Sequence, residues 1–312
     1  MAFDVPIAFC IYNRPEMARR VLMAIREQRP KKLFVIADGP KVDDEVDKLR
    51  VQETLRSLEL IDWNCDVVLG DSLINLGCRN RIATGLTWAF GQTERLIILE
   101  DDCLPTPAFF GFCRDLLDRY ADDERVMMIS GDRFHPASEF DADYYFSRWT
   151  HIWGWASWRR AWQKFDVDLN SWPSIAVQEK LQASAAPREF AAWRSVFEKV
   201  YRQELDTWDF SWQYACWLND GLVAIPPRNL VTNIGFGAAA THTHDSNSRW
   251  ANLPAFDFRD YSHPHRVQRN VAADDWSFEK IFAPAFEQPP EVKRKSRMDS
   301  WWRSWKAVAR IR

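Results

Sequence analysis

The first 130 residues alternate short apolar runs with segments that have the periodicity of a helix. The apolar runs span residues 6–12, 33–38, 65–70, 95–100 and 126–130, and the helical segments span 16–28, 43–60, 79–90 and 105–120. Strands separated by helices of this length predict a mostly parallel sheet with right-handed crossovers. Because the runs are apolar almost throughout, we expect helices on both faces of the sheet. The pattern therefore predicts an α/β, Rossmann-like fold.

The remainder of the chain is less regular. We expect a main domain over residues 1–245, with a helical insertion at about 165–205. Within it, residues 223–231 resemble a strand that Pro226 and Pro227 interrupt. Beyond it, 246–290 is polar and rich in proline, which predicts an irregular extension, and 291–312 form a basic, Trp-rich tail.

Composition narrows the possible classes of protein. The formal net charge of -3 argues against a nucleic-acid binder. No apolar run approaches the ~20 residues of a membrane span, and the start of the chain lacks the basic-then-apolar pattern of a signal peptide. The six cysteines form no CxxC pair, which is typical of reduced thiols. We therefore expect a bacterial cytoplasmic protein.

Three consecutive acids, Glu100, Asp101 and Asp102, follow the apolar run 95–100 directly. Ligands of open parallel sheets bind beyond the carboxyl ends of the strands. Three adjacent carboxylates repel one another unless a cation compensates, and Mg²⁺ or Mn²⁺ accepts one or two carboxylates together with substrate phosphates. The triplet indicates a site for a metal ion and a diphosphate. A solvated acidic turn, with Asp102 capping the next helix, is the alternative.

Further polar side chains are placed by the strand pattern at the same edge of the sheet: Asn13, Arg14, Asp38, Asn75, Arg79 and Arg81. Arginine suits phosphate oxygens because its planar fork donates in pairs. An aspartate near a base edge can accept a hydrogen bond from an imide N–H. Each residue alone is more typical of a turn or a helix cap, but together they favour a nucleotide pocket. No GxGxxG or GxxxxGK[ST] loop is present, so another device must hold the phosphates.

These motifs carry a family resemblance. Residues 79–117, which contain RLIILEDDCLPTPAFF, resemble the core of GT-A glycosyltransferases. The EDD motif, between a hydrophobic strand and a Pro–Phe–Phe helix, is similar to that of the N-acetylglucosaminyltransferase I family. The likeness extends over about residues 5–245 and includes IAFCIYNRP near the start, GWASW at 154–158 and Thr207-Trp208-Asp209.

The resemblance implies transfer of a sugar, a hexose or N-acetylhexosamine, from a nucleotide diphosphate to a hydroxyl, with inversion. Asp102 would bind Mn²⁺ or Mg²⁺, and Asp209 would be the catalytic base. Contacts to the nucleotide would come from Arg14, Asp38, Glu100 and Asp101. Asp38 would meet uracil, which favours a UDP-sugar. Phe210 stands where the family has a second acid, and the acceptor does not transfer; we expect a glycan or a lipid-linked acceptor.

Three expectations concern the second half of the chain. Asp209 lies among large aromatic residues, which would desolvate it and raise its pKa; its alternative role is to cap a helix. His242 and His244 would lie on a loop over the diphosphate, with His242 on the metal and His244 as a possible contact; ordinary loop histidines are the alternative. Trp155, beside a glycine, could contact the acceptor, although large aromatic residues more often pack in a core.

The tail places Trp301, Trp305 and Val308 on one side of a helix among basic residues, which is typical of an anchor at an anionic membrane surface. Its alternatives are a solvated end or a helix docked on a partner.

Two other functions remain open at this point. A sugar nucleotidyltransferase would show a Gly-rich basic loop after the first strand, where this chain has Asn13-Arg14-Pro15. A carbohydrate-binding protein without catalysis would not need the convergent acids and arginines.

Overall fold

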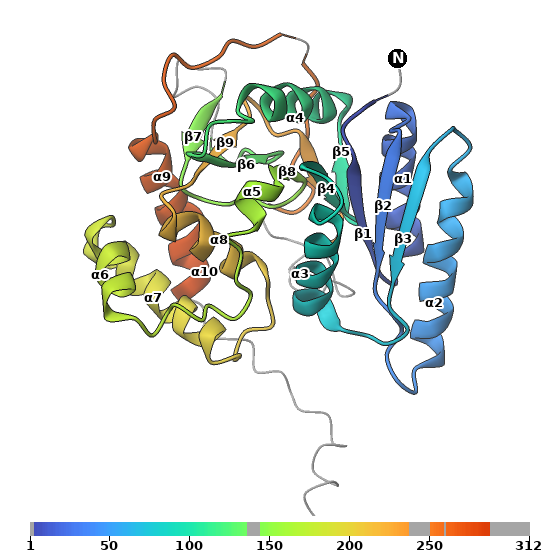
Figure 1. The fold of residues 1–312 in the computed structure, drawn as a ribbon, viewed down its shortest axis with the longest axis horizontal. Coiled ribbons are helices and arrows are strands. Elements are labelled where there is room, and N and C mark those ends of the chain that lie inside the picture. Colours follow the sequence, from blue (N-terminus) through green and yellow to red (C-terminus); the bar gives the residue numbers. More distant parts are fainter. Residues whose placement is uncertain (1–2, 136–143, 237–249, 259, 288–312) are drawn as a thin grey trace, which may run out of the picture.

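The computed structural model describes residues 3–135, 144–236, 250–258 and 260–287. Its centre is an eight-stranded sheet in the order β3-β2-β1-β4-β8-β6-β9-β7, with helices packed on both faces (Figure 1). The predicted α/β class with a mostly parallel sheet is confirmed. Across the described ranges, no helix combines the length and hydropathy that crossing a bilayer needs. The tail 291–312 lies outside the described residues, so its membrane contact stays a prediction.

The first half of the sheet is parallel. Its strands are β1 (Ile7–Ile11), β2 (Lys32–Ala37), β3 (Asp66–Asp71) and β4 (Arg95–Glu100), connected by α1 (Pro15–Gln28), α2 (Glu45–Arg56), the 3-10 turn η1 (Ser57–Leu60) and α3 (Gly77–Phe90). The chain runs outward from β1 to β3 and then returns to the other side of β1 as β4. This reversal between β1 and β4 is the point where open α/β sheets bind ligands.

Apolar spacing decides which face each helix covers. Buried residues of α1, such as Val21 and Leu22, join one core cluster, whereas Ile82 and Leu86 of α3 join another on the opposite face. Pro15 begins α1, where its missing N–H costs no hydrogen bond. The two apolar layers bury β1 completely, which fixes the carboxyl ends of β1 and β4 side by side.

The second half of the sheet is mixed. It contains β6 (Val126–Ser130), β7 (Tyr145–Ser147), β8 (Trp155–Trp158) and β9 (Leu222–Ile225), while α4 (Pro107–Arg119) precedes β6. The strand β8 lies antiparallel between β4 and β6. The strand predicted over 223–231 is two strands: β9 stays in the large sheet, and β10 (Val231–Asn233) pairs with β5 (Cys103–Pro105). This pairing brings the segment after β10 next to the acidic triplet.

The predicted helical insertion contains two helices, α6 (Ile175–Ala183) and α7 (Pro187–Tyr201), and Pro187 begins the second of them. They follow α5 (Arg159–Trp162), precede α8 (Asp209–Leu218) and surround a separate aromatic core. The extension predicted as irregular also contains helices: α9 (Val271–Ser277), a π-helical turn η3 (Phe278–Phe282) and α10 (Ala283–Glu287). Figure 1 shows α9 and α10 on the side of α7 and α8.

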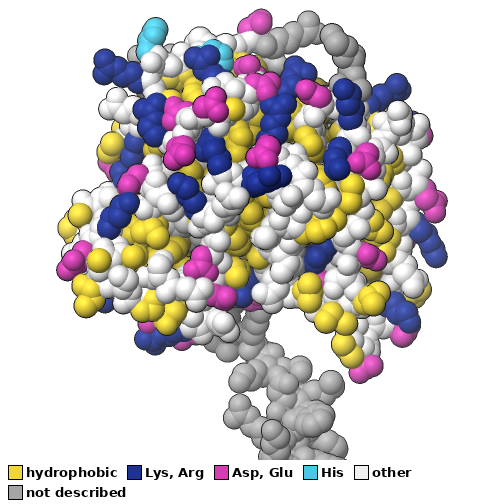
Figure 2. Space-filling model, in the orientation of Figure 1, with side chains coloured by type: hydrophobic (Ala, Val, Ile, Leu, Met, Phe, Trp, Pro, Cys, Tyr) yellow, Lys and Arg dark blue, Asp and Glu magenta, His cyan; other side chains and the backbone are white. Residues whose placement is uncertain are grey.

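The strand β3 is less buried than its sequence suggests. It forms the edge of the sheet, and Val67 and Leu69 are 39% and 48% exposed. Charged side chains of both signs are interspersed over the face of the molecule seen in Figure 2, without a single-sign field. That distribution agrees with the small net charge.

Candidate active site

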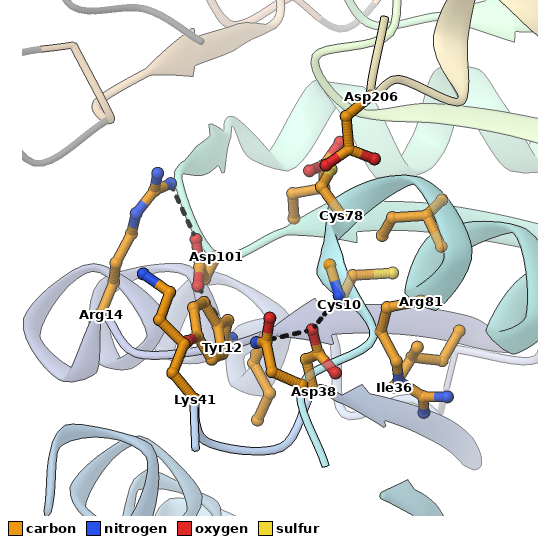
Figure 3. Close-up of a pocket in the computed structure, with 15 residues that line it drawn as sticks. Cys10, Tyr12, Arg14, Ile36, Asp38, Lys41, Cys78, Arg81, Asp101 and Asp206 are labelled. Atoms are coloured by element: carbon orange, nitrogen blue, oxygen red, sulfur yellow. Dashed lines mark hydrogen bonds and ion pairs between the residues drawn. The ribbon is translucent and has the colours of Figure 1, made fainter. Parts of the chain in front are cut away.

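The carboxyl ends of β1 and β4 open into two adjoining cavities of about 240 and about 340 Å³. Both are lined by Arg14, Cys78, Glu100 and Asp206, so they form one continuous site. The polar residues that line the first cavity include Tyr12, Asp38, Lys41, Arg81 and Asp101 (Figure 3), together with Asn75. The second is bounded by Asp102, Trp153, Asn233 and residues 205–210. The acidic triplet lies where the two cavities meet.

Arg14 forms ion pairs with two acids of the triplet. Arg14 Nη1 lies 2.7 Å from Asp102 Oδ2 and 3.3 Å from Asp101 Oδ1. Burial, reinforced by the two neighbouring aspartates, raises the pKa of Glu100 to about 8. Burial also raises the pKa of Asp101 to about 7, against the lowering effect of Arg14. Ionising all three acids together is therefore unfavourable even beside Arg14, and a bound cation would offset that cost.

The described residues contain no group of three or more acids, histidines or cysteines arranged to hold a metal ion. Asp102 still fits a site of the kind in which one carboxylate and substrate phosphates share the metal. The segment after β10 packs closely on it: Ile234 N donates to Asp102 O at 2.8 Å, and a Cβ on Gly235 would lie 2.2 Å from Asp102 Oδ2. His242 and His244 lie outside the described residues, so their roles stay predictions.

Asp38 holds the loop before α3. Its Oδ1 accepts from the backbone N–H groups of Gly39 and Leu76, both at 2.9 Å. Its Oδ2 accepts from Gly77 N and from the Asn75 amide, both at 3.1 Å. Four donors occupy the lone-pair sites that a carboxylate offers. The structure thus uses Asp38 and Asn75 to shape the wall of the first cavity, and the expected contact of Asp38 with uracil has no acceptor left for it.

Two other predicted nucleotide contacts are also structural. Arg79 is 9% exposed, and its Nη2 lies 2.6 Å from Asp168 Oδ1 and donates to Val167 O. Asn13 donates from Nδ2 to Asp47 Oδ1 at 2.5 Å, which ties the end of β1 to α2. Neither residue lines the two cavities. The sequence pattern predicted the correct edge of the sheet for both residues. It did not indicate that Asp47 would bind Asn13 or that Asp168 would bind Arg79.

The first cavity has basic and aromatic groups of its own. Arg81 donates to Gly70 O, and its buried Nε has no hydrogen-bond partner within the described part of the chain. Lys41 lies at the same cavity with an exposed side chain, and Tyr12 donates to Asp47 Oδ2 at 2.6 Å. Lys41 and Tyr12 were missed in the sequence, although each follows a strand within four residues. A planar, anionic ligand finds donors here.

Asp209 lies at the second cavity and is the first residue of α8. Its Oδ1 accepts from Phe210 N at 2.9 Å and from the Thr207 hydroxyl. Burial raises the pKa of Asp209 to about 6, which the backbone N–H donors only partly oppose. Asp209 is the first helical residue and Trp208 is the cap, so the alternative role of Asp209 as a helix cap is wrong, while its role as a catalytic base stays a prediction.

Trp153, Trp208 and Phe210 line this cavity, whereas Trp155 does not. Trp155 is fully buried and stacks on Trp208 at 5.7 Å, so the expectation that it contacts an acceptor is wrong: its ring offers no surface. Trp153 is partly exposed and lines the second cavity. Asp206, exposed and shared by both cavities, was also missed. The only signal for it was its place three residues before Asp209.

No family model matches the chain, and no curated protein matches it. Among solved structures, it is similar to the mannosyltransferase PcManGT from Pyrobaculum calidifontis in complex with GDP-Man and Mn²⁺ (14% identity, 70% of each chain, TM-score 0.40). It is also similar to the galactosyltransferase LgtC in complex with donor and acceptor sugar analogs (12% identity, 92% of this chain and 98% of that chain, TM-score 0.35). A third similar structure is the inositol-1-phosphate CTP transferase from T. maritima (8% identity, 78% and 93%, TM-score 0.37).

At these identities and TM-scores, none of the likenesses identifies a substrate for this chain. They also do not single out the N-acetylglucosaminyltransferase I family, and that resemblance stays a prediction.

Proposed function

We propose that this chain is an inverting, divalent-metal-dependent glycosyltransferase that moves a sugar from a nucleoside diphosphate to an acceptor hydroxyl. One observation carries the proposal: the acidic triplet Glu100–Asp102 lies where a cavity of about 240 Å³ meets a second cavity that holds a desolvated carboxylate. Such a junction suits a diphosphate with a base or ribose on one side and a sugar on the other.

The nucleoside would occupy the first cavity. Arg81, with its unpartnered Nε, and Lys41 supply donors, and the ring of Tyr12 supplies an apolar surface. Because the Asp38 carboxylate already accepts four hydrogen bonds from its own loop and the loop before α3, the expected selectivity for uracil rests on the family resemblance alone. We keep a UDP-sugar as the first donor to test.

The diphosphate would lie against Arg14 and Asp102. Asp102 would hold Mn²⁺ or Mg²⁺, which when bound stabilises the charge that develops on the leaving diphosphate. Arg14, held in place by its ion pairs with Asp101 and Asp102, would place its positive charge next to the phosphate oxygens.

The acceptor would enter the second cavity. Asp209 would take the proton of the attacking hydroxyl, and with a pKa of about 6 it is a stronger base than an ordinary aspartate yet ionised at neutral pH. Trp153 offers a ring on which the C–H face of a sugar can pack. The acceptor is a glycan or a lipid-linked sugar in this proposal, and His242 and His244 stay candidates for the metal and the diphosphate.

A release assay tests the proposal. The protein is incubated with UDP-, GDP- and dTDP-sugars, Mn²⁺ and candidate acceptors, and free nucleoside diphosphate is measured with and without EDTA. We expect release that needs the metal and falls at least a hundredfold in Asp102→Asn, but not in the exposed control Asp122→Asn. A nucleotidyltransferase would instead form pyrophosphate from a nucleoside triphosphate and a sugar phosphate, and a binding module would release nothing. The anomeric configuration of the product, read by NMR, tests inversion.

A further inference from the structure

A third cavity, of about 430 Å³, shares no lining residue with the two described above. It is formed by the segment after β6, the connection from β9 to β10 and residues 253–256. Its lining residues are Arg133, His135, Arg228, Asn229, Leu253, Pro254 and Phe256. Two arginines and no acid line it, so its character differs from that of the acidic site.

Arg133 is the unusual member of this cavity, because its guanidinium is buried but forms no ion pair with a carboxylate in the described part of the chain. The residue is 5% exposed. Its Nε donates to His135 O and its Nη1 to Pro226 O, both at 3.2 Å. Its buried Nη2 has no hydrogen-bond partner, and no ion pair joins Arg133 to a carboxylate anywhere in the described ranges. Burial lowers the pKa of Arg133, and the centre of the Tyr145 ring lies 5.3 Å from its central carbon.

The neighbouring acid does not compensate this charge. Asp132 is fully buried and accepts from Trp153 N at 2.7 Å, but it forms no ion pair with Arg133. A buried cation without a counter-charge is costly, and a buried donor without an acceptor adds to that cost. An unsatisfied buried group in a folded protein needs an explanation, and a ligand that supplies the missing partner is one.

The remaining residues complete a binding surface. The backbone N–H of Arg133 donates to Asn229 Oδ1, and Asn229 Nδ2 donates to Val231 O and Pro254 O, which fixes the wall of the cavity. Arg228 is exposed at the same cavity, with its guanidinium 5.8 Å from the ring of Phe256. One arginine thus lies inside and a second lies at the mouth, beside an apolar wall.

We propose that this cavity binds a carboxylate or phosphate group of a small organic ligand. Arg133 Nη2 supplies the buried donor, Arg228 supplies a second positive charge, and Leu253, Pro254 and Phe256 contact the apolar part of the ligand. The site is independent of the proposed glycosyl transfer, because none of its residues belongs to the two cavities at the acidic triplet.

Calorimetric titration of the full chain tests this inference at constant ionic strength. Inorganic phosphate and glucuronate are the two probes, and chloride replaces them in the reference titration. We expect saturable binding of at least one probe, and the stronger one identifies whether the site prefers phosphate or carboxylate. Arg228→Ala should weaken binding about tenfold, the effect of one charge-assisted hydrogen bond. The matched control Arg20→Ala removes an exposed arginine from α1 and should leave binding unchanged.

Arg133→Met should abolish binding, and Arg133→Lys should retain part of it. If Arg133→Met does not fold, Arg228→Ala decides the question alone, because its side chain is exposed. The proposal is overturned if neither probe saturates at millimolar concentrations. It is equally overturned if Arg228→Ala and Arg20→Ala reduce binding to the same extent, since the effect would then be one of overall charge.

Discussion

Replacing Asp209 by asparagine should stabilise the protein at neutral pH while it removes activity. Burial raises the pKa of Asp209 from 3.8 to about 6. Folding therefore favours the protonated carboxyl, and the wild type loses stability as the pH rises from about 4 to about 6. A shift of this size corresponds to at most about 3 kcal/mol. Asparagine keeps the Oδ1 that accepts from Phe210 N but carries no charge to desolvate.

Chemical denaturation at pH 4 and pH 8 measures this difference. At pH 4 the two proteins should have nearly equal free energies of unfolding, and at pH 8 the Asp209→Asn variant should be more stable, by up to about 3 kcal/mol. Asp206→Asn is the matched control: it lies three residues away and is exposed, so its stability should stay within about 0.5 kcal/mol of the wild type at both pH values. A variant Asp209→Asn that is less stable than the wild type at pH 8 would refute the desolvation argument.

The same substitution tests the chemistry. Loss of a general base should lower kcat by roughly 10²–10⁴-fold with little change in the KM for the donor. The kcat of the wild type should rise with pH through about 6 and level off above it, because only the ionised Asp209 can accept a proton. A flat profile between pH 5 and pH 8 would contradict the role of Asp209, even if the stability result holds.

The remaining predictions concern the acidic triplet and the core. Arg14→Met should lower the free energy of unfolding by about 3 kcal/mol at pH 9. The loss should be clearly smaller at pH 5, because the raised pKa values of Glu100 and Asp101 let both acids take up protons there. Chemical denaturation at the two pH values measures the difference. Gly235→Ala should lower the metal-dependent rate at least tenfold, because its Cβ would lie 2.2 Å from Asp102 Oδ2; the metal concentration for half-maximal rate is the readout. Trp155→Phe should reduce stability by about 2 kcal/mol and leave the acceptor KM unchanged, which would confirm that this ring belongs to the core.

The first half of the fold could be predicted because its signal is local. Apolar runs separated by helical periodicity specify parallel strands, and parallel strands end at one edge. This reasoning placed Arg14, Arg81 and the acidic triplet at the site. The antiparallel strand β8 was not predicted, because its four residues lack the alternation of polar and apolar side chains that distinguishes a strand from a loop. The edge position of β3 also depends on the order of strands, which no single segment encodes.

Which group each polar side chain binds could not be predicted either, because that also depends on parts of the chain that are distant in sequence. Asn13, Asp38 and Arg79 all lie at the predicted edge, yet each is bound to a group far away in sequence, such as Asp168 for Arg79. A polar residue at a strand end can equally hold a loop or a ligand, and only the three-dimensional arrangement shows which donors and acceptors are already satisfied.

Arg133 shows that a side chain with an unused donor is as hard to recognise from the sequence as one whose partners are satisfied. The chain contains 41 lysine and arginine residues, and nothing in the sequence distinguishes Arg133 from the others. The structure buries Asp132 and Arg133 and joins them to different groups, so the acid meets Trp153 N while the guanidinium keeps an unused donor. Because the cost of an unpaired buried charge depends on its surroundings and not on its neighbours in sequence, a site of this kind becomes visible only when burial and hydrogen bonds are examined together.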